Sequence, residues 1–405
     1  MNPSRQTRNT LLFLAMCMSL QMTGFVMILP LFARRFEDFG AGVEALGISA
    51  MAYALTSTLA APWMGVLADR FGRRPIILFS LAAYVVAFSG YLFATSAWLL
   101  IVLRGLAGIF TSGLVPTIIS IVGDLTPEEC RAKWIGIVNG GSSAGWIIGP
   151  LLGGLLYDHF GYGVPLTVSV TLATGALLLA VFQIPETQPT HNRPAREHPG
   201  SKMLKALHIS PFPSLLTFPL LLMICFGVMF VWAFIEPQFM FYAYNNLRWT
   251  SSHLGLVMST YGIALTFGEF ALGPLSDRLG RKPVLVLGLI LYSAQFIGLA
   301  FFHEAIAIAA CFVLAGLGNA LYDPAVSAHI LDITPSEYKA RIMGLKSTAG
   351  SLGSMLGPAL VVLFTPIFSP RVVFLIATTL VFLLVFASGF VLRETNTLES
   401  TQYST

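Results

Sequence analysis

Four ionisable side chains stand inside long apolar stretches of this chain: Arg104, Glu236, Glu269 and Asp323. A charge inside a bilayer is costly, so a residue of this kind is first interpreted as functional. Glu236 and Asp323 are each followed by a proline, which frees a backbone carbonyl and opens a polar pocket in a helix. A carboxyl partly removed from water holds a proton more readily. We therefore predict that these two acids bind and release protons.

Each of these residues also has a plainer interpretation. Glu236 is compatible with a solvated interface position, Asp323 with a role at a helix end, and Arg104 with a side chain that extends to the outer interface. Glu269 lies near an expected inner interface. If Arg104 is instead buried, its guanidinium stays charged and can act on a nearby carboxyl or organise internal water.

The composition requires a bilayer around the chain. Of its 405 residues, 56% are hydrophobic and only 10% are charged, whereas about 25% of the residues of a soluble domain are charged. About 20 apolar residues make a helix that crosses a membrane, and the apolar runs lack the period of two typical of a membrane barrel. We therefore expect an all-α membrane protein with about twelve transmembrane helices. The predicted spans are residues 10–33, 46–67, 75–94, 97–122, 134–157, 163–184, 214–243, 253–274, 283–302, 305–331, 342–365 and 370–392.

Basic residues set the expected orientation. With the N-terminus inside, seventeen of the 23 Lys and Arg residues fall in inner tails and loops. The positive-inside rule then places both termini in the cytoplasm. The first apolar run is too long for a cleaved signal peptide, so it is expected to be the first span. The other six basic residues are Arg34, Arg35, Arg248 and Arg371 on the outer side, Arg104 within a span and Lys346 at the start of one.

The chain repeats itself at a constant offset of 208 residues, from Gly72 to Gly280. Residues 72–75 read GRRP and residues 280–283 read GRKP, and Gly-Pro pairs further along keep the same offset. A polar, Pro-rich stretch separates the copies. We therefore expect an N-terminal six-helix half over 1–184, a cytoplasmic linker over 185–213 and a C-terminal six-helix half over 214–405. Parallel repeats are typical of transporters that rock two halves around a central site.

The loop after the second span in each half combines glycines and charges in a fixed order. Residues 65–75 read GVLADRFGRRP and residues 273–283 read GPLSDRLGRKP. Both resemble the loop signature of the major facilitator superfamily, G-x-L-a-D-r-x-G-r-k, and the resemblance covers essentially the whole chain. It implies the major facilitator fold, with two pseudo-symmetric six-helix halves.

A set of charges in each half is interpreted as a conformational latch between helices. Glycines let helix ends approach closely, and acidic and basic groups can then form charge-assisted contacts. The alternative is topogenic charge combined with a tight turn. The two sets are Asp69, Arg73 and Asp124 in the first half and Asp277, Arg281 and Asp332 in the second.

The fifth span contains closely spaced glycines around a proline, GWIIGPLLGG. This run resembles the G-x-x-x-G-P-x-x-G-G signature of the antiporter branch of the superfamily. Small residues let helices touch and the proline bends the helix, although ordinary packing would also explain them. The second half keeps Gly353 and Gly357 but has valines in place of the final glycine pair. The residues of the motif are Gly145, Gly149, Pro150, Gly153 and Gly154.

Three further resemblances concern proton coupling. Residues 103–108, LRGLAG, are similar to a span-four motif whose arginine is linked to proton coupling, which assigns that role to Arg104. Acids in spans seven and ten resemble the arrangement in quinolone-type multidrug exporters, and residues 24–30 resemble the first span of drug:proton antiporters. Tetracycline exporters carry an acid in span one, whereas residues 19–23 contain none, which argues against tetracycline. The resulting proton-coupling set is Glu236, Asp323, Arg104 and Glu269.

The substrate region is suggested by aromatic residues in span seven. Trp232 and Phe234 lie close to Glu236 in the sequence. Aromatic faces beside a carboxylate suit a lipophilic cation, although aromatics also line membrane interfaces. The expected substrate-binding residues are Trp232, Phe234, Glu236 and, in span one, Gln21.

These features predict a proton-coupled secondary active exporter of lipophilic small molecules, cationic ones among them, that works by alternating access. A metabolite symporter or a lipid translocase of the same fold is the alternative, and a transporter-like sensor is a third option. The sequence has no P-loop or nucleophile motif, and its four cysteines have no metal or disulfide spacing, so neither an enzyme, a cofactor nor a metal is predicted. The expected partners are a small-molecule substrate, protons and the lipid bilayer, with no nucleic acid. The expected form is a monomer in the bacterial cytoplasmic (inner) membrane.

Overall fold

The described part of the structure, a computed structural model, is built from helices. It describes residues 5–187, 216–272, 275–334, 338–365 and 367–392, and every regular element within these ranges is helical. Twelve helices within these ranges are long and apolar enough to cross a membrane, and each coincides with one of the predicted spans. The prediction of an all-α membrane protein with twelve spans is therefore confirmed.

Seven helices make up the first six spans, because the fourth span is divided. Its first part ends at Thr111 and its second begins at Leu114. Pro116 lies in the first turn of the second part, where a residue without a backbone N–H is tolerated. The helices are α1 (Arg5–Asp38), α2 (Val43–Phe71), α3 (Arg73–Leu92), α4 (Ala97–Thr111), α5 (Leu114–Leu125), α6 (Glu128–Phe160) and α7 (Gly163–Gln183).

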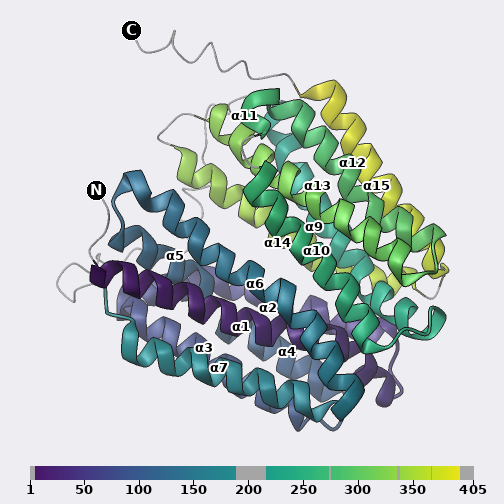
Figure 1. Cartoon of the computed structure of the whole chain (residues 1–405), viewed down its shortest axis with the longest axis horizontal. Helices are drawn as coiled ribbons and strands as arrows, with labels where there is room; N and C mark the ends of the chain where they lie inside the picture. The colour runs from purple at the N-terminus through teal and green to yellow at the C-terminus, as the bar shows by residue number, and fades with distance from the viewer. Residues whose placement is uncertain (1–4, 188–215, 273–274, 335–337, 366, 393–405) are drawn as a thin grey trace. The chain divides into compact units, whose positions relative to one another are not determined.

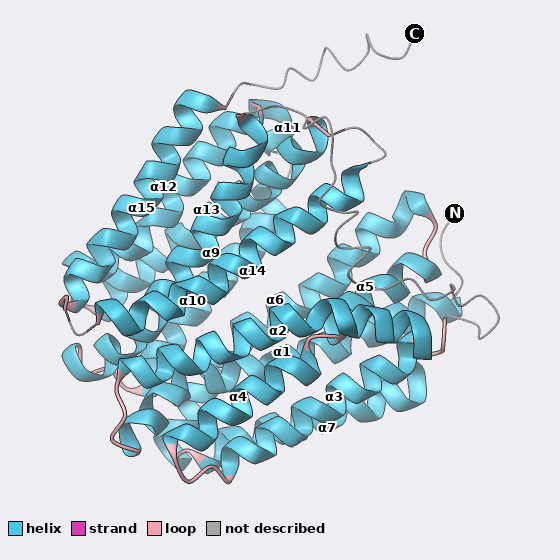
Figure 2. Cartoon of the chain, turned by 180° about the vertical axis from the view of Figure 1, so that it is seen from behind, coloured by secondary structure: helices cyan, strands magenta, loops and turns pink. Residues whose placement is uncertain are grey.

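The remaining spans begin with α9, which is followed by a short π-helical turn. This turn comes shortly after Pro237, which stands inside α9. Figure 2 shows the helices from the side opposite to that of Figure 1. The elements are α9 (Thr217–Phe241), η2 (Tyr242–Asn246), α10 (Ser251–Leu272), α11 (Leu275–Leu279), α12 (Arg281–Phe301), α13 (Ala305–Asp332), α14 (Lys339–Phe364) and α15 (Pro370–Val391).

Contacts divide the chain into two compact units. The first unit comprises residues 1–207 together with 237–259, and the second comprises 208–236 with 260–405. The end of α9, the π-turn and the start of α10 thus pack with the first six spans, although they belong to the second sequence copy. Most of the predicted linker, residues 188–213, lies outside the described residues.

Within the first unit, α1 is the most densely packed helix. It lies against α6 and α7, while α2 packs on α4 and α3 packs on both α4 and α7 (Figure 1). Large side chains such as Phe32, Phe36 and Phe88 are fully buried there. Within the second unit, α12 packs against α13 and α15, and Phe296, Phe312 and Phe374 fill the core between helices.

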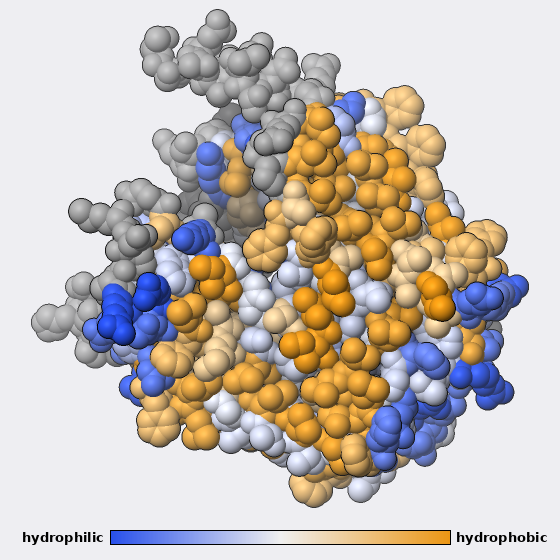
Figure 3. Space-filling view, viewed as in Figure 1, coloured by the Kyte–Doolittle hydropathy of each residue, from blue (hydrophilic) through white to orange (hydrophobic). Residues whose placement is uncertain are grey.

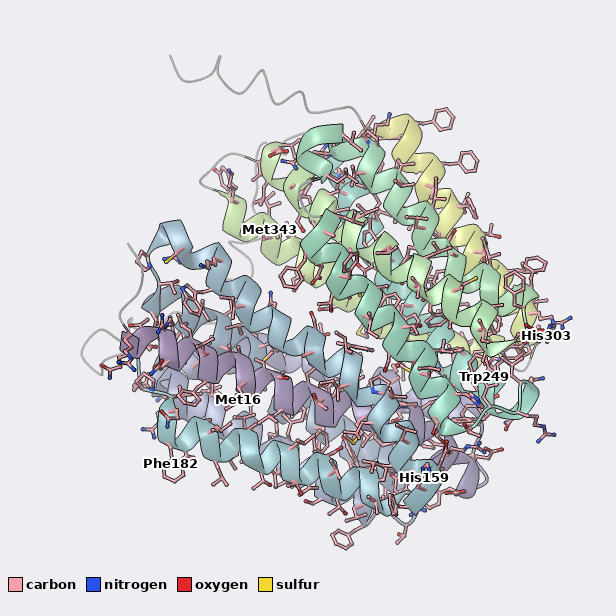
Figure 4. All side chains as sticks on the ribbon, viewed as in Figure 1. Met16, His159, Phe182, Trp249, His303 and Met343 are labelled. Carbon is pink, nitrogen blue, oxygen red and sulfur yellow. The ribbon has the colours of Figure 1, made fainter. Side chains whose placement is uncertain are left out.

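The outward-facing side chains are apolar, as a lipid environment requires. Phe182, Phe270 and Phe390 are all more than three-quarters exposed, and the side chain of Phe182 points away from α7 in Figure 4. Figure 3 shows apolar residues over much of the visible face, with hydrophilic residues gathered towards its margins. A soluble protein rarely exposes contiguous apolar surface on this scale.

Candidate functional site

Arg104 occupies the middle of α4, where its side chain is buried among aromatic rings. Its side chain is only 6% exposed, so it does not extend to the interface. The guanidinium carbon lies 4.7 Å from the Tyr53 ring centre, 5.0 Å from that of Phe32 and 5.8 Å from that of Phe25. Cation–π attraction from these rings offsets part of the cost of burying the charge.

The glycines next to Arg104 explain how α4 reaches this position. A Cβ on Gly108 would collide with Thr56 and with the backbone of Tyr53, so only glycine permits the close approach of α4 to α2. The Thr56 hydroxyl then donates to the Gly105 carbonyl at 2.8 Å. The sequence LRGLAG therefore positions Arg104 by fixing α4 against α2.

Asp323 on α13 forms an ion pair with a residue that the sequence analysis left without a role. Lys346 Nζ on α14 lies 2.7 Å from Asp323 Oδ1 and donates to Ser327 Oγ at 2.6 Å. Ser327 in turn donates to the Asp323 carbonyl at 2.8 Å. The Asp323 side chain is 50% exposed and that of Lys346 is 16% exposed. The carboxylate therefore keeps access to its surroundings, while the ammonium is largely enclosed.

The other two acids of the predicted proton-coupling set are Glu269 and Glu236, both in the second unit. Glu269 on α10 is exposed and interacts electrostatically with Asp323. Tyr261, eight residues before Glu269 on the same helix, accepts a hydrogen bond from Asn319 at 2.5 Å and interacts electrostatically with both Asp323 and Glu269. Glu236 is half-buried at the end of the second unit's part of α9. Asp323, Glu269, Lys346 and Tyr261 thus form one polar cluster in the second unit.

Two residues of the first predicted latch set, Arg73 and Asp124, are in contact. Arg73 Nη1 makes an ion pair with the Asp124 carboxylate and donates to the Ser120 carbonyl at 2.6 Å. Asp69 attracts Arg73 electrostatically, but no ion pair or hydrogen bond joins the two within the described residues. Of the three predicted members, two are therefore in direct contact.

Glu186 also contacts Arg73, although the sequence analysis placed it in the linker without a role. Its carboxylate accepts the backbone N–H groups of Arg73 at 3.0 Å and Arg74 at 3.2 Å. These are the first residues of α3, where unpaired N–H groups and the helix dipole favour an anion. Gly72, with a φ of 105°, leaves room for the carboxylate, because a Cβ there would collide with it.

The second predicted latch set repeats the contact of the first between its arginine and its distal acid. Arg281 Nε lies 3.0 Å from Asp332 Oδ2, and Arg281 Nη1 donates to Ser276 Oγ at 2.8 Å. The side chain of Asp277 lies outside the described residues. Residues at equivalent positions of the two sequence copies, 208 residues apart, therefore form equivalent ion pairs: Arg73 with Asp124, and Arg281 with Asp332.

Three glycines of the span-five motif form the contact between α6 and α1. A Cβ added to Gly145 would lie 2.7 Å from the Thr23 nitrogen, and one on Gly149 would lie 3.0 Å from the Thr23 carbonyl oxygen. Gly153 meets the backbone of Met27 in the same way. The spacing of four residues places all three on one helix face, where they allow backbone-to-backbone packing.

Gly154 and Pro150 present a second face of α6 to the start of α10. Cβ atoms on Gly154 and Gly255 would collide with the backbones of Ser251 and Pro150, respectively. Close by, Asp158 accepts the N–H groups of Ser251 at 3.0 Å and Ser252 at 2.7 Å, which caps the N-terminus of α10. The motif thus joins α6 to two helices at once.

The second sequence copy retains only one of these two faces. Cβ atoms on Gly353 and Gly357 would collide with the α9 backbone at Phe226 and Phe230, as their counterparts do with α1. The position equivalent to Gly154 is Val362. Gly154, the second glycine of the pair, therefore serves the contact with α10, which has no glycine-based equivalent at this position of the second copy.

A contact from α1 also reaches the segment before α10. Arg34 Nη2 donates to the Trp249 carbonyl at 3.3 Å, and its guanidinium lies 4.1 Å from the Tyr244 ring centre. Tyr244 donates to the Pro30 carbonyl at 3.1 Å. Figure 4 labels Trp249 in this segment, where Arg248 adopts a φ of 56° that is uncommon for a residue with a side chain.

The predicted substrate residues fall into the two units. Trp232 stacks on Tyr261, with ring centres 6.4 Å apart, while Phe234 is buried against Phe230 and Phe364. Both belong to the second unit, as does Glu236. Gln21 is buried in the first unit. Trp232 thereby contacts Tyr261 of the polar cluster.

Three functional candidates escaped the sequence analysis: Lys346, Glu186 and Asp158. Lys346 stands at the start of a span, where a basic residue suggests topology rather than chemistry. Glu186 and Asp158 follow the ends of apolar runs, where acids are common. Their partners are more than ninety residues away in the sequence, so no local pattern signals these contacts. Within the described residues, no group of three or more His, Cys, Asp or Glu side chains is arranged to hold a metal.

The sequence matches the family model described as "Major Facilitator Superfamily" over residues 11–247 and again over 237–404. It is 28% identical over 346 residues to the "Tetracycline resistance protein, class B" of Escherichia coli, covering 84% of each chain. It is also 28% identical over 338 residues to the "Multi-drug resistance efflux pump PmrA homolog" of Lactococcus lactis, covering 82% of this chain and 81% of that one.

A solved structure with the same fold is that of the nucleoside transporter NupG. The TM-score is 0.78 at 14% sequence identity, and the alignment covers 95% of this chain and 100% of the other. At this identity, the likeness concerns the arrangement of helices rather than the transported compound.

Proposed function

Because this chain belongs to the Major Facilitator Superfamily, we propose that it is a proton-coupled secondary active exporter of lipophilic small molecules. It works by alternating access, with the two six-helix halves, residues 1–184 and 214–405, moving about a central site. It acts as a monomer in the bacterial inner membrane with both termini in the cytoplasm. The efflux pumps among its relatives support export rather than uptake.

The observation that carries the proposal is the Asp323–Lys346 ion pair within two membrane spans. When the Asp323 carboxylate takes up a proton, its charge is lost and its attraction for the Lys346 ammonium falls. Lys346 then keeps only its hydrogen bond to Ser327. Loss of the proton restores the pair. Binding or release of the proton thereby changes the packing of α13 against α14. Coupling requires a two-state element of this kind.

The two latches and the motif on α6 supply the conformational part of the mechanism. Arg73–Asp124 and Arg281–Asp332 hold helix ends together at equivalent positions of the two halves. The α6 glycines bring α6 into close contact with α1 and with the start of α10. Contacts of this kind stabilise one conformation and must be broken or rearranged in another. Glu236, Glu269 and Arg104 complete the proposed proton-coupling set.

The proposed substrates are aromatic or otherwise lipophilic compounds. Trp232 and Phe234 offer aromatic surface in the same unit as the polar cluster. The stretch 19–23 has Gln21 and no carboxyl in the first span, which favours a substrate other than tetracycline despite the relatives of that class.

Proton-driven accumulation in proteoliposomes tests this function. The full chain is reconstituted with an acidic interior, and the membrane potential is set to zero with valinomycin and equal potassium. The panel consists of permanently charged aromatic cations and anions, since neutral amines would accumulate in an acidic interior without a transporter. An antiporter accumulates its substrate inside. Asp323→Asn and Glu236→Gln are expected to lower the initial rate at least tenfold, whereas the exposed Glu304→Gln serves as the matched control.

Two results would contradict the proposal. Accumulation only when the interior is made alkaline would indicate symport. Failure of the wild type to move any compound in the panel, with intact protein recovered from the vesicles, would exclude a broad exporter of lipophilic compounds. In that case a specific metabolite or a lipid becomes the expected substrate.

A further inference from the structure

An unpaired positive charge is buried in the middle of the first unit. Arg104 is the eighth residue of the fifteen in α4, and its side chain is 6% exposed. Its Nε and Nη1 are buried and have no hydrogen-bond partner. Other arginines with a buried, unpaired Nε, such as Arg34 and Arg35, bond a carbonyl through Nη2. A guanidinium has five N–H donors and stays charged in proteins. The buried Nε and Nη1 of Arg104 therefore remain available to donate to an acceptor.

The described spans of this unit contain no carboxylate that could supply that acceptor. No ion pair of Arg104 is found among the described residues. Every acidic residue of α1 to α7 lies in the first two or the last three residues of its helix, whereas α3, α4 and α7 contain none. The residues 237–259 that pack with this unit contain none either. The acids of these seven helices are Glu37, Asp38, Glu44, Asp69, Asp124, Glu128, Glu129 and Asp158.

The surroundings of Arg104 are aromatic and come from three neighbouring helices. Phe25 and Phe32 belong to α1, Tyr53 to α2, and Tyr91 on α3 interacts with the guanidinium through its hydroxyl. Phe25 and Tyr53 are each half-buried, so this side of the cluster is not sealed within the unit. Flat rings with a fork-shaped donor at their centre suit a flat molecule that carries an acidic group.

We propose that Arg104 and the surrounding rings bind the acidic group of the exported compound, so that the substrates include lipophilic organic acids and not only cations. This inference rests on the function proposed above, because it assigns the charge of the substrate of that exporter. The aromatic body of the ligand lies against Phe25 and Tyr53, and its carboxylate or sulfonate accepts hydrogen bonds from Arg104. In the second unit, by contrast, the Asp323 carboxylate already has a cationic partner, Lys346.

Two small aromatic compounds with ring systems of the same size and opposite fixed charge provide the test. Naphthalene-2-sulfonate is an anion and N-methylquinolinium is a cation at any working pH, and both are bicyclic. Equilibrium binding is measured by dialysis against the full chain in lipid nanodiscs. The wild type is expected to bind the sulfonate saturably. Arg104→Gln is expected to weaken that binding at least tenfold, and Arg104→Lys, which keeps the charge but not the fork, by a smaller factor.

The matched control removes an arginine elsewhere in the molecule. Arg371→Gln changes the charge beside His303 in the second unit and should leave sulfonate binding unchanged. Quinolinium binding should be the same in the wild type and in Arg104→Gln. If Arg104→Gln does not fold, the wild type alone decides, because a sulfonate that binds the folded state raises its melting temperature and quinolinium does not do so through this site.

The possible results separate this inference from the function on which it rests. Sulfonate binding that is equal in the wild type and Arg104→Gln, or a wild type whose melting temperature does not respond to sulfonate, would overturn the assignment. Proton-driven transport of quinolinium together with no sulfonate binding would overturn it and leave the exporter intact. Arg104-dependent sulfonate binding without proton-driven transport of either compound would support the site and contradict the exporter.

Discussion

Asp323 and Lys346 form an ion pair that stabilises the protein only while both charges are present. Each ion alone in a low-dielectric interior costs several kcal/mol of desolvation, and the partner's charge compensates much of it. Ser327 anchors the ammonium and is itself held by the Asp323 backbone. The pair is therefore sensitive to any event that changes the charge of one member, and protonation of the half-exposed carboxylate is the simplest such event.

A double-mutant cycle on this pair tests that dependence. Lys346→Met alone leaves the Asp323 charge uncompensated, and Asp323→Asn alone leaves the ammonium uncompensated. Because the Asp323 carboxylate is half exposed, each single variant is expected to lower the free energy of unfolding by about 1–2 kcal/mol, less than for a fully buried pair. The double variant removes both charges and should recover most of the lost free energy of unfolding, which is measured by the melting temperature. It should remain inactive in proton-coupled transport.

The transport part of this cycle carries the functional claim. A double variant that transports at the wild-type rate against a proton gradient would show that the pair is structural only. Single variants that melt at the wild-type temperature would show that the pair contributes no net stability.

The glycines of α6 act at the scale of helix packing. Gly145, Gly149 and Gly153 allow α1 and α6 to meet along their backbones, and Gly154 extends this contact to α10. Asp158 adds a cap at the N-terminus of α10. Two adjacent faces of α6 therefore contact α1 and the start of α10, and a larger side chain on either face must push the helices apart.

Two glycines of the same helix form a matched pair for testing this contact. A Cβ on Gly153 meets the Met27 backbone, whereas a Cβ on Gly140 has nothing within 4 Å. We expect Gly153→Ala to destabilise the protein by about 1–3 kcal/mol because packed backbones cannot yield. Gly140→Ala should stabilise it by about 0.5–1 kcal/mol through helix propensity alone. Thermal unfolding in detergent measures both, and equal effects of the two substitutions would contradict the proposed contact.

At the level of elements, much of the architecture follows from hydropathy. Twelve spans were predictable because every run of about 20 apolar residues must become a helix in a bilayer. The division of the fourth span at Ser112 and Gly113 and the π-turn after α9 were not predictable, since both depend on how neighbouring helices meet. Likewise, the sequence indicated a glycine motif but not that it has two faces, because Ser251 lies about a hundred residues further on.

The charged residues of the candidate site were predictable from the sequence, but most of their partners were not. Arg104, Asp323 and Glu269 stand out because charge is rare in apolar runs. The rings around Arg104 come from three other helices, and no local pattern distinguishes Phe32 from any other membrane phenylalanine. Lys346 was hidden by its position at a span end, where basic residues are common.

At the scale of the whole molecule, the sequence repeat and the contacts between residues divide the chain at different places. The sequence copies predict a boundary after residue 184, whereas contacts group 237–259 with the first six spans. The reason lies in the first copy, where Gly154, Asp158 and Arg34 each contact this segment. A segment of the second copy is thereby held by side chains of the first, and a change in those contacts would alter both sequence halves together.

The direction of proton movement tests the central claim of proton-coupled export most directly. Proteoliposomes loaded with a compound from the panel that the protein transports are diluted into weakly buffered medium without it, and the pH of the medium is followed at zero membrane potential. By linkage, substrate leaving down its gradient must drive protons inward through an antiporter. We predict that the medium becomes more alkaline at a rate proportional to substrate exit, and that Asp323→Asn abolishes the change. Acidification of the medium, or substrate exit without any proton movement, would contradict proton-coupled export.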